Sequence, residues 1–168
     1  MVYVFGKLAE EMLCKKPVMV THADKNRSLV RCGQCLACRI RKREEWTCRI
    51  LLESRMHKYS SFMTLTYDEN SLPENGSLRV KDLQDFLKRL RHDFPETAIR
   101  YFISGEYGPK TGRPHYHGVL FGVRPDQLQP PYMLPEETVL ARRWKNGFTN
   151  CSGLNAQRAR YVAKYTTT

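Results

Sequence analysis

The sequence predicts an α+β domain with a central antiparallel sheet and flanking helices, preceded by a short cysteine-rich segment. Three observations predict it: β-branched and aromatic segments between turn residues, a helical apolar repeat between two of these segments, and closely spaced cysteines near the amino terminus. We assign residues 1–58 to the cysteine-rich segment and residues 59–168 to the α+β domain. The helices are expected on one side of the sheet.

The first elements follow from local residue preferences. Residues 39–58 lack Gly and Pro and are rich in helix formers, so a long helix should lead out of the cysteine group. Residues 62–67 (FMTLTY) predict a strand, which the turn-rich residues 68–76 end. From Val80 onward, apolar residues recur at helical spacing with Lys and Arg between them, which predicts an amphipathic helix that stops near Pro95.

The remaining elements are a hairpin and a final helix. Residues 99–107 and 115–123 read as two strands joined by a GPKTG turn, so they should pair antiparallel. The Pro-rich residues 125–135 argue against regular structure, and residues 144–148 predict a turn between short elements. The last helix should begin near Asn155, so the predicted sheet has three strands.

The charge of the chain predicts a polyanionic partner. Its 28 Lys and Arg residues exceed its 17 Asp and Glu residues, for a net charge of +11. Nucleic acid is the leading candidate, and an anionic membrane surface is the alternative. No apolar run approaches the roughly 20 residues that span a bilayer, and the amino terminus lacks the order of a signal peptide. We therefore expect a soluble, intracellular protein that does not act at a membrane.

A His-x-His pair predicts a metal site. His115 and His117 project from one face of their strand because strand side chains alternate, and Glu106 precedes the turn in the partner strand. Two imidazoles and a carboxylate would bind a divalent cation, with Mn²⁺ or Mg²⁺ favoured by the carboxylate and Zn²⁺ or Co²⁺ also compatible with the imidazoles. Alone, such a pair is more often two ordinary hydrogen-bonded histidines, so Glu106 decides the interpretation.

Two tyrosines four residues apart, Tyr161 and Tyr165, share one face of the predicted last helix. We expect the small residues of this helix to pack on the sheet and the phenols to face outward beside Arg158 and Lys164. A metal site together with two phenols suggests phosphoryl transfer through a covalent tyrosine ester. Ionising a free phenol at neutral pH costs about 4 kcal/mol, so we expect the cation or Lys164 to lower the phenol pKa.

The clustered cysteines predict a structural zinc site, because thiols in a chain without an export signal are metal ligands before they are disulfides. The expected ligands are Cys14, Cys32, Cys35 and Cys38. His22 and Cys48 are alternatives for the fourth ligand, and an iron–sulfur cluster would also fit the thiols.

A basic run follows the cysteines on the predicted helix. Next to a metal module in a basic protein, such a run is expected to contact the phosphates of a nucleic acid. The expected DNA-binding residues are Arg39, Arg41, Lys42 and Arg43, with Arg158 on the last helix. Three aromatic side chains, Tyr107, Tyr116 and Trp144, are candidates to stack on unpaired bases, although packing would explain each equally well.

Three segments, in order, resemble the HUH endonuclease superfamily and, within it, the replication initiation proteins of microvirus single-stranded DNA phages of the gokushovirus type. They are the strand FMTLTY, the hairpin motifs GEYG and RPHYH, and the tyrosine motif YVAKY. The amino-terminal CGQCLACR and residues 46–53 also resemble this phage group. Because members of the family continue past the tyrosine motif, a longer natural chain is expected.

The resemblance implies an RRM-like nuclease fold and rolling-circle replication in the cytoplasm of an infected bacterial host. One tyrosine would attack the phosphate of a single-stranded origin, stay linked to the 5′ end and leave a 3′ hydroxyl, and the other would act when the circle is closed. Host replication helicase and polymerase are candidate partners. An HUH transposase or relaxase, and a zinc-containing nucleic-acid-binding protein without catalysis, are the alternatives.

Overall fold

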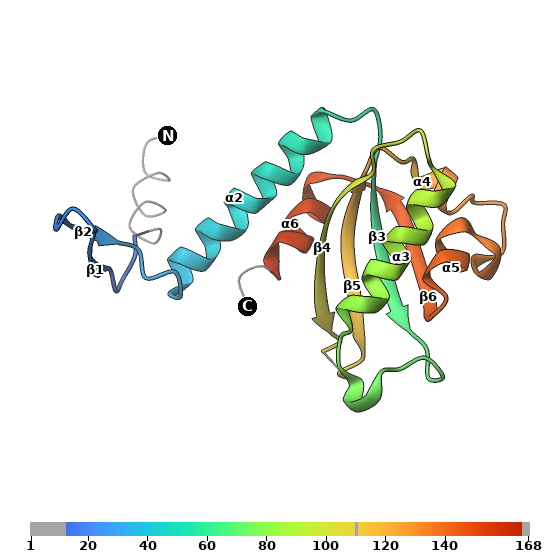
Figure 1. Cartoon of the computed structure of the whole chain (residues 1–168), viewed down its shortest axis with the longest axis horizontal. Helices are drawn as coiled ribbons and strands as arrows, with labels where there is room; N and C mark the ends of the chain where they lie inside the picture. Colours follow the sequence, from blue (N-terminus) through green and yellow to red (C-terminus); the bar gives the residue numbers. More distant parts are fainter. Residues whose placement is uncertain (1–12, 110, 166–168) are drawn as a thin grey trace, which may run out of the picture.

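The structure is a computed structural model that describes residues 13–109 and 111–165 (Figure 1). Within these residues the central element is a four-stranded antiparallel sheet of order β4–β5–β3–β6. Its strands are β3 (Ser60–Tyr67), β4 (Arg100–Tyr107), β5 (Pro114–Phe121) and β6 (Gly147–Gly153). The predicted α+β class, the antiparallel sheet and the flanking helices are confirmed.

The expectation of three strands is wrong, because β6 adds a fourth strand along the edge of β3. Its sequence, GFTNCSG, holds several residues with little preference for strands, so pairing with β3 rather than composition makes it a strand. The strand begins at Gly147, where φ is +135° and a Cβ atom would lie 2.3 Å from the backbone nitrogen of Asp68. Only glycine fits this approach of two backbones.

Helices cover both faces of the sheet, so the expectation of helices on one side is also wrong (Figure 1). The helices are α3 (Val80–Asp93) and α5 (Val139–Trp144) on one face and α2 (Leu36–Arg55) and α6 (Ala156–Lys164) on the other. The central strand β5 serves both cores by alternation, since Val119 packs under α2 and α6 while Leu120 packs under α3. Val123 was expected on the face of Val119, but Gly122, with φ of +98°, redirects the chain and Val123 joins the opposite core.

The cysteine-rich region contains a hairpin of β1 (Val18–Thr21) and β2 (Arg27–Val30), followed by α2. Helix α2 projects from the sheet and carries the hairpin at its distant end (Figure 1). Residues 1–12 of the expected cysteine-rich segment, Lys110 of the predicted turn and residues 166–168 lie outside the described residues.

Two short helical turns occur where Pro argued against regular structure: α4 (Pro125–Leu128) and η2 (Pro135–Glu137). Each begins with Pro, which the first helical turn tolerates because its N–H groups have no partner within the helix. Among the described residues, we find no helix with the length and apolar character required to cross a membrane.

Candidate metal and tyrosine site

Antiparallel pairing of β4 with β5 sets Glu106 directly opposite His115. Oε2 of Glu106 lies 3.3 Å from Nε2 of His115 and 3.1 Å from Nε2 of His117. All three side chains are largely shielded from solvent, and their potential ligand atoms lie within 4.8 Å of one another. The predicted trio is therefore brought together, and it could hold a metal ion with positions left for other ligands.

Hydrogen bonds orient both imidazoles so that Nε2 faces Glu106. Nδ1 of His115 donates to the backbone carbonyl of Arg113 over 2.9 Å, so the neutral ring carries its lone pair on Nε2. Nδ1 of His117 lies 3.0 Å from Oγ1 of Thr64, which is its direct neighbour on β3. Contacts of this kind fix the orientation of metal-binding imidazoles.

The sequence analysis gave no role to Thr64 or Phe62, although both lie in the predicted strand FMTLTY. Their side chains share the strand face that looks toward α6, and the ring of Phe62 is stacked near His117 with a centroid distance of 6.0 Å. The same ring meets Tyr161 edge-on at 6.4 Å. The spacing Phe-x-Thr was the available signal, but it acquires meaning only once β3 is known to pair with β5.

The protonation states suit a metal site. Burial, followed by the neighbouring His115, lowers the pKa of His117 to about 4, so this imidazole is neutral at pH 7. Burial acts to raise the pKa of Glu106, but hydrogen bonds from Tyr165 and Tyr161, helped by the two imidazoles, outweigh it and hold the pKa below its usual value. A carboxylate beside imidazoles with available Nε2 atoms fits Mn²⁺ or Mg²⁺, and it also suits Zn²⁺.

Helix α6 brings both predicted tyrosines to the same carboxylate. The Tyr161 hydroxyl donates to Oε2 of Glu106 over 3.0 Å and lies 3.3 Å from Nε2 of His117. The Tyr165 hydroxyl donates to Oε1 of Glu106 over 2.5 Å. The expectation that the phenols face outward is thus wrong, because their hydroxyls turn back over the sheet even though Tyr161 is 39% exposed.

The position of α6 follows from its small residues. Ala159, Val162 and Ala163 are fully buried against the sheet, as their spacing predicts. The side chain of Asn155 accepts from the N–H of Arg158 and caps the amino end of the helix. Small side chains let the helix lie close to the sheet, so the long tyrosine side chains on the next face can reach Glu106.

The phenols are protonated in this arrangement. Burial, and then the nearby Glu106 carboxylate, raise the pKa of Tyr165, and burial is also the main cause of the raised pKa of Tyr161. Nζ of Lys164 lies over the ring of Tyr165, 5.2 Å from its centroid. The expected lowering of the phenol pKa is therefore absent here, and ionisation would require the contact with Glu106 to weaken.

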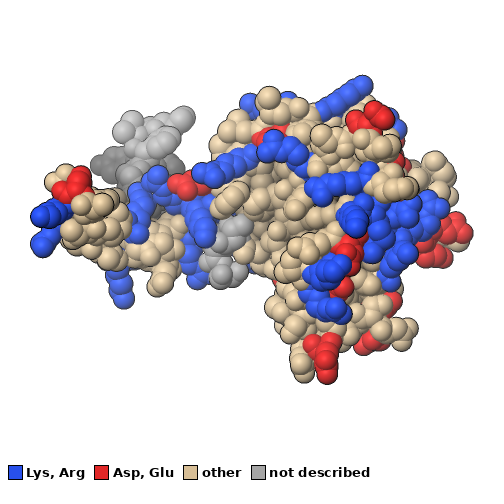
Figure 2. Space-filling model, viewed as in Figure 1, with Lys and Arg blue, Asp and Glu red and all other residues tan. Residues whose placement is uncertain are grey.

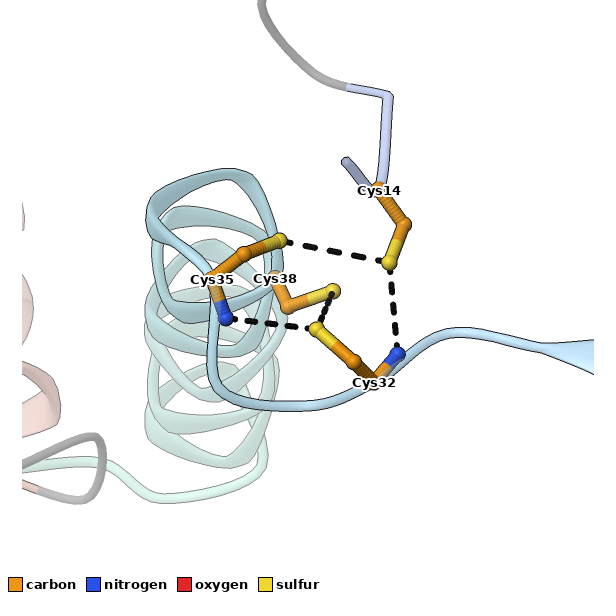
Figure 3. A group of neighbouring side chains, drawn as sticks. All are labelled: Cys14, Cys32, Cys35 and Cys38. Carbon is orange, nitrogen blue, oxygen red and sulfur yellow. Dashed lines mark hydrogen bonds between the residues drawn. The ribbon is translucent and has the colours of Figure 1, made fainter. Parts of the chain in front are cut away.

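The second cluster of potential metal ligands consists of Cys14, Cys32, Cys35 and Cys38 (Figure 3). Their sulfur atoms lie within 4.8 Å of one another, and Cys35 occupies the position before the first residue of α2. The N–H groups of Cys38 and Lys15 lower the pKa of Cys35 to about 6, whereas burial raises the pKa of Cys38 to about 12. Four convergent thiols could hold one metal ion in tetrahedral geometry.

The alternative ligands do not join this cluster among the residues that the structure describes. His22 lies in the β1–β2 hairpin, where its Nε2 is 2.6 Å from Oγ of Ser28. Cys48 is exposed on α2, about three turns beyond Cys38. Cys14 is therefore the fourth member of the group.

The expected DNA-binding residues lie on two helices that face each other. Those on α2 are Arg39, Arg41, Lys42 and Arg43, and in the space-filling view Lys and Arg side chains follow this helix (Figure 2). Arg158 lies on α6, over the ring of Phe62. An ion pair joins the helices, with Glu44 Oε1 at 2.8 Å from Arg160.

Two of the three base-stacking candidates are excluded by burial. Tyr116 is 4% exposed and Trp144 is 0% exposed, and both belong to the core beneath α3 and α5. Tyr107 is half exposed at the end of β4, and its hydroxyl accepts from the N–H of Leu78. Tyr107 alone of the three could meet a base.

Comparisons with known proteins agree with this site. The sequence profile of a family of replication-associated proteins, described by its member ORF2, matches residues 60–168. Replication-associated protein ORF2 of Spiroplasma virus 4 is 33% identical over 156 residues, which cover 82% of this chain and 48% of that protein. Replication-associated protein VP4 of Bdellovibrio phage phiMH2K is 32% identical over 147 residues, covering 80% and 46%. The chain thus spans just under half the length of these two relatives.

A solved structure is also similar in part. The crystal structure of the hypothetical protein ORF119 from Sulfolobus islandicus rod-shaped virus 1 aligns with a TM-score of 0.42 and 14% identity, over 71% of this chain and 92% of that chain. A similarity this low carries no argument about the site.

Proposed function

The chain belongs to the ORF2 family of replication-associated proteins, and from this premise we propose that it nicks and rejoins single-stranded DNA at a replication origin. The observation that carries the proposal is the convergence of two phenol hydroxyls on Glu106, the carboxylate that also faces His115 and His117. The proposed protein is an HUH-type endonuclease that starts rolling-circle replication in the cytoplasm of an infected bacterium.

In the proposed reaction, a tyrosine oxygen attacks the phosphorus of the scissile phosphodiester. A bond forms between phosphorus and the phenol oxygen, the bond to the 3′ oxygen breaks, and the 3′ oxygen takes up a proton to become a hydroxyl. The 5′ side of the DNA stays attached to the protein as a phosphotyrosine ester. Because one phosphodiester replaces another, the same site can reverse the step and join ends without ATP.

The residues of the site have distinct parts in this proposal. Glu106, His115 and His117 would hold Mn²⁺ or Mg²⁺, and a bound cation would polarise the phosphate and stabilise the charge that develops on it. Glu106 positions both nucleophiles, Tyr161 and Tyr165, by accepting their hydrogen bonds, and its oxygens are the nearest acceptors for the phenol protons. Lys164, over the ring of Tyr165, would favour the ionised phenol once the contact with Glu106 weakens.

The cysteine cluster supports a second part of the proposal, in which it holds one structural Zn²⁺. The site would anchor the start of α2 and orient the basic run that follows it on the same helix. Arg39, Arg41, Lys42 and Arg43 would contact the phosphates of the DNA, with Arg158 on α6 doing so nearer the tyrosines.

The test is formation of a covalent adduct. Labelled single-stranded origin DNA from the genome that encodes the chain is incubated with the protein and Mn²⁺, and products are separated on a denaturing gel. The unmodified protein should form an adduct, whereas Tyr161→Phe with Tyr165→Phe should form none, because both proposed nucleophiles are absent. Tyr132→Phe removes the hydroxyl of an exposed tyrosine and should retain the adduct.

Two outcomes would contradict the proposal. An adduct that survives the double Phe change would show that neither tyrosine is the nucleophile. DNA binding with no adduct under any divalent cation would instead support a zinc-containing nucleic-acid-binding protein without catalysis.

A further inference from the structure

A pocket of about 170 Å³ lies between α2 and the β4–β5 pair, away from the metal and tyrosine site. Its lining combines apolar and aromatic residues with two arginines and one glutamate. We propose that it binds one nucleotide of the single-stranded DNA that the site would cut, with the base on the apolar floor and the phosphate at the arginines. This inference rests on the proposed function, which it extends to the recognition of a nucleotide beside the scissile phosphate.

The floor and one wall of the pocket suit a flat aromatic ring. Ile50 and Phe121 are almost fully buried beneath it, and the Trp46 ring packs on Phe102 with a centroid distance of 5.0 Å. Stacking on aromatic side chains is the usual way in which proteins hold unpaired bases. Since clefts for drug-sized ligands measure about 300–1,000 Å³, this smaller space would take a single ring system rather than a longer stretch of DNA.

The rim of the pocket suits a phosphate. The guanidinium of Arg49 lies over the Trp46 ring at 5.1 Å, and in the described part of the chain it has no carboxylate partner. Arg100 lies 3.0 Å from Glu53, which is also 2.8 Å from Nε2 of His57. The Glu53 charge is therefore engaged at the base of the rim, while Arg49 can present its N–H groups to an anion.

The position of the pocket agrees with a DNA strand that passes over the tyrosines. Phe102 and Phe121 belong to the same apolar cluster as Val162 of α6, so pocket and tyrosines share one face of the sheet. Phe102 precedes Glu106 by four residues on β4, which is about 14 Å at roughly 3.4 Å per residue. A strand with its scissile phosphate at Glu106 could therefore place a neighbouring nucleotide in the pocket.

Tryptophan fluorescence tests the inference directly. Trp144 is 0% exposed in the opposite core, so a change in emission on binding reports Trp46, the other tryptophan of the chain. Titrating the metal-loaded protein with a single-stranded oligonucleotide from the origin should quench this emission as the base stacks on the indole. Arg49→Gln should weaken binding roughly tenfold, and Trp46→Leu by about five-fold or more.

Matched variants separate the pocket from general charge. Arg142→Gln removes an exposed charge from α5 on the opposite face and should weaken binding clearly less than Arg49→Gln. Should Trp46→Leu fail to fold by circular dichroism, the exposed Arg49 variant still decides the question. Unchanged Trp46 emission at saturating DNA, or equal losses for the two arginine variants, would overturn the inference. Normal adduct formation in that case would leave the proposed function intact, whereas quenching without any adduct would remove the nuclease and retain the pocket.

Discussion

The two clusters of potential metal ligands in this protein are built in opposite ways. Three of the four cysteines lie within seven residues, in a loop and the first turn of α2. The Glu106, His115 and His117 group, with its two tyrosines, draws on β4, β5 and α6 and spans 60 residues of sequence. A local cluster can be inferred from spacing, whereas a distributed one depends on strand register and on where a distant helix packs.

The clusters also differ in what surrounds them. The β1–β2 hairpin beside the cysteines keeps most of its side chains exposed, including Met19 and Leu29, so burial contributes little to its stability. The histidines and Glu106 lie on a sheet with cores on both faces. We therefore expect a metal to stabilise structure at the cysteines and to serve chemistry at the histidines.

The largest expected effect comes from removing either cluster in turn. Cys32→Ser with Cys35→Ser should abolish stoichiometric zinc and expose the amides of β1, β2 and the first turns of α2 to hydrogen exchange, while the sheet keeps its protection. His115→Ala with His117→Ala should do the reverse, retaining zinc while adduct formation falls by about 100-fold or more. Metal analysis, exchange mapping and the adduct gel measure these effects. Loss of protection throughout the sheet in the cysteine variant would show that the clusters are not independent.

An intermediate effect is expected at Thr64, which contacts Nδ1 of His117. Thr64→Val should lower Mn²⁺ affinity about 10- to 100-fold, because the imidazole loses the partner that orients it. Thr64→Ser keeps the hydroxyl and should restore most of the affinity, measured by the electron paramagnetic resonance signal of free Mn²⁺. Thr66→Val makes the same change two residues along β3 and is the control. Equal affinities in the two valine variants would refute the assigned contact.

A smaller effect distinguishes the thiols of the cysteine cluster. With a pKa of about 6, Cys35 is mostly thiolate at pH 7 in the metal-free protein, whereas Cys38, with a pKa of about 12, is protonated. Iodoacetamide should therefore modify Cys35 faster, and its rate should fall as the pH drops below about 6. Peptide mass mapping measures the order, and prior loading with zinc should protect both. Faster modification of Cys38 would contradict the hydrogen bonds assigned to Cys35.

The smallest effect is expected at the ion pair that joins α2 to α6. Glu44 and Arg160 are both partly exposed, so Glu44→Gln should lower the free energy of unfolding by less than about 1 kcal/mol. Ile50 packs with Val162 in the core between the same helices, and Ile50→Ala should cost about 2–4 kcal/mol. Denaturant unfolding compares them. A larger loss for Glu44→Gln would mean that charge, rather than apolar packing, holds the helices together.

The sequence identified most elements because their signals are local. The α3 repeat, the β4–β5 hairpin and α6 are all present, with ends within a few residues of those expected. Strand β6 was missed because Gly, Asn and Ser do not prefer strands, and only the open edge of β3 makes them one. The helices on the second face were missed because α2 had been assigned to the cysteine segment, although its Ile50 packs on the sheet.

By itself, the sequence determined which side chains could do chemistry: four thiols, a His-x-His pair with a carboxylate across a turn, and two phenols on one helix face. Spacing carries this information, because side-chain direction repeats every two residues in strands and about every 3.6 in helices. Only the tertiary structure decided that Tyr161 and Tyr165 turn inward to Glu106 and that Thr64 and Phe62 support His117. Those contacts join segments far apart in the chain, and their geometry depends on sheet register and helix packing, which no local pattern encodes.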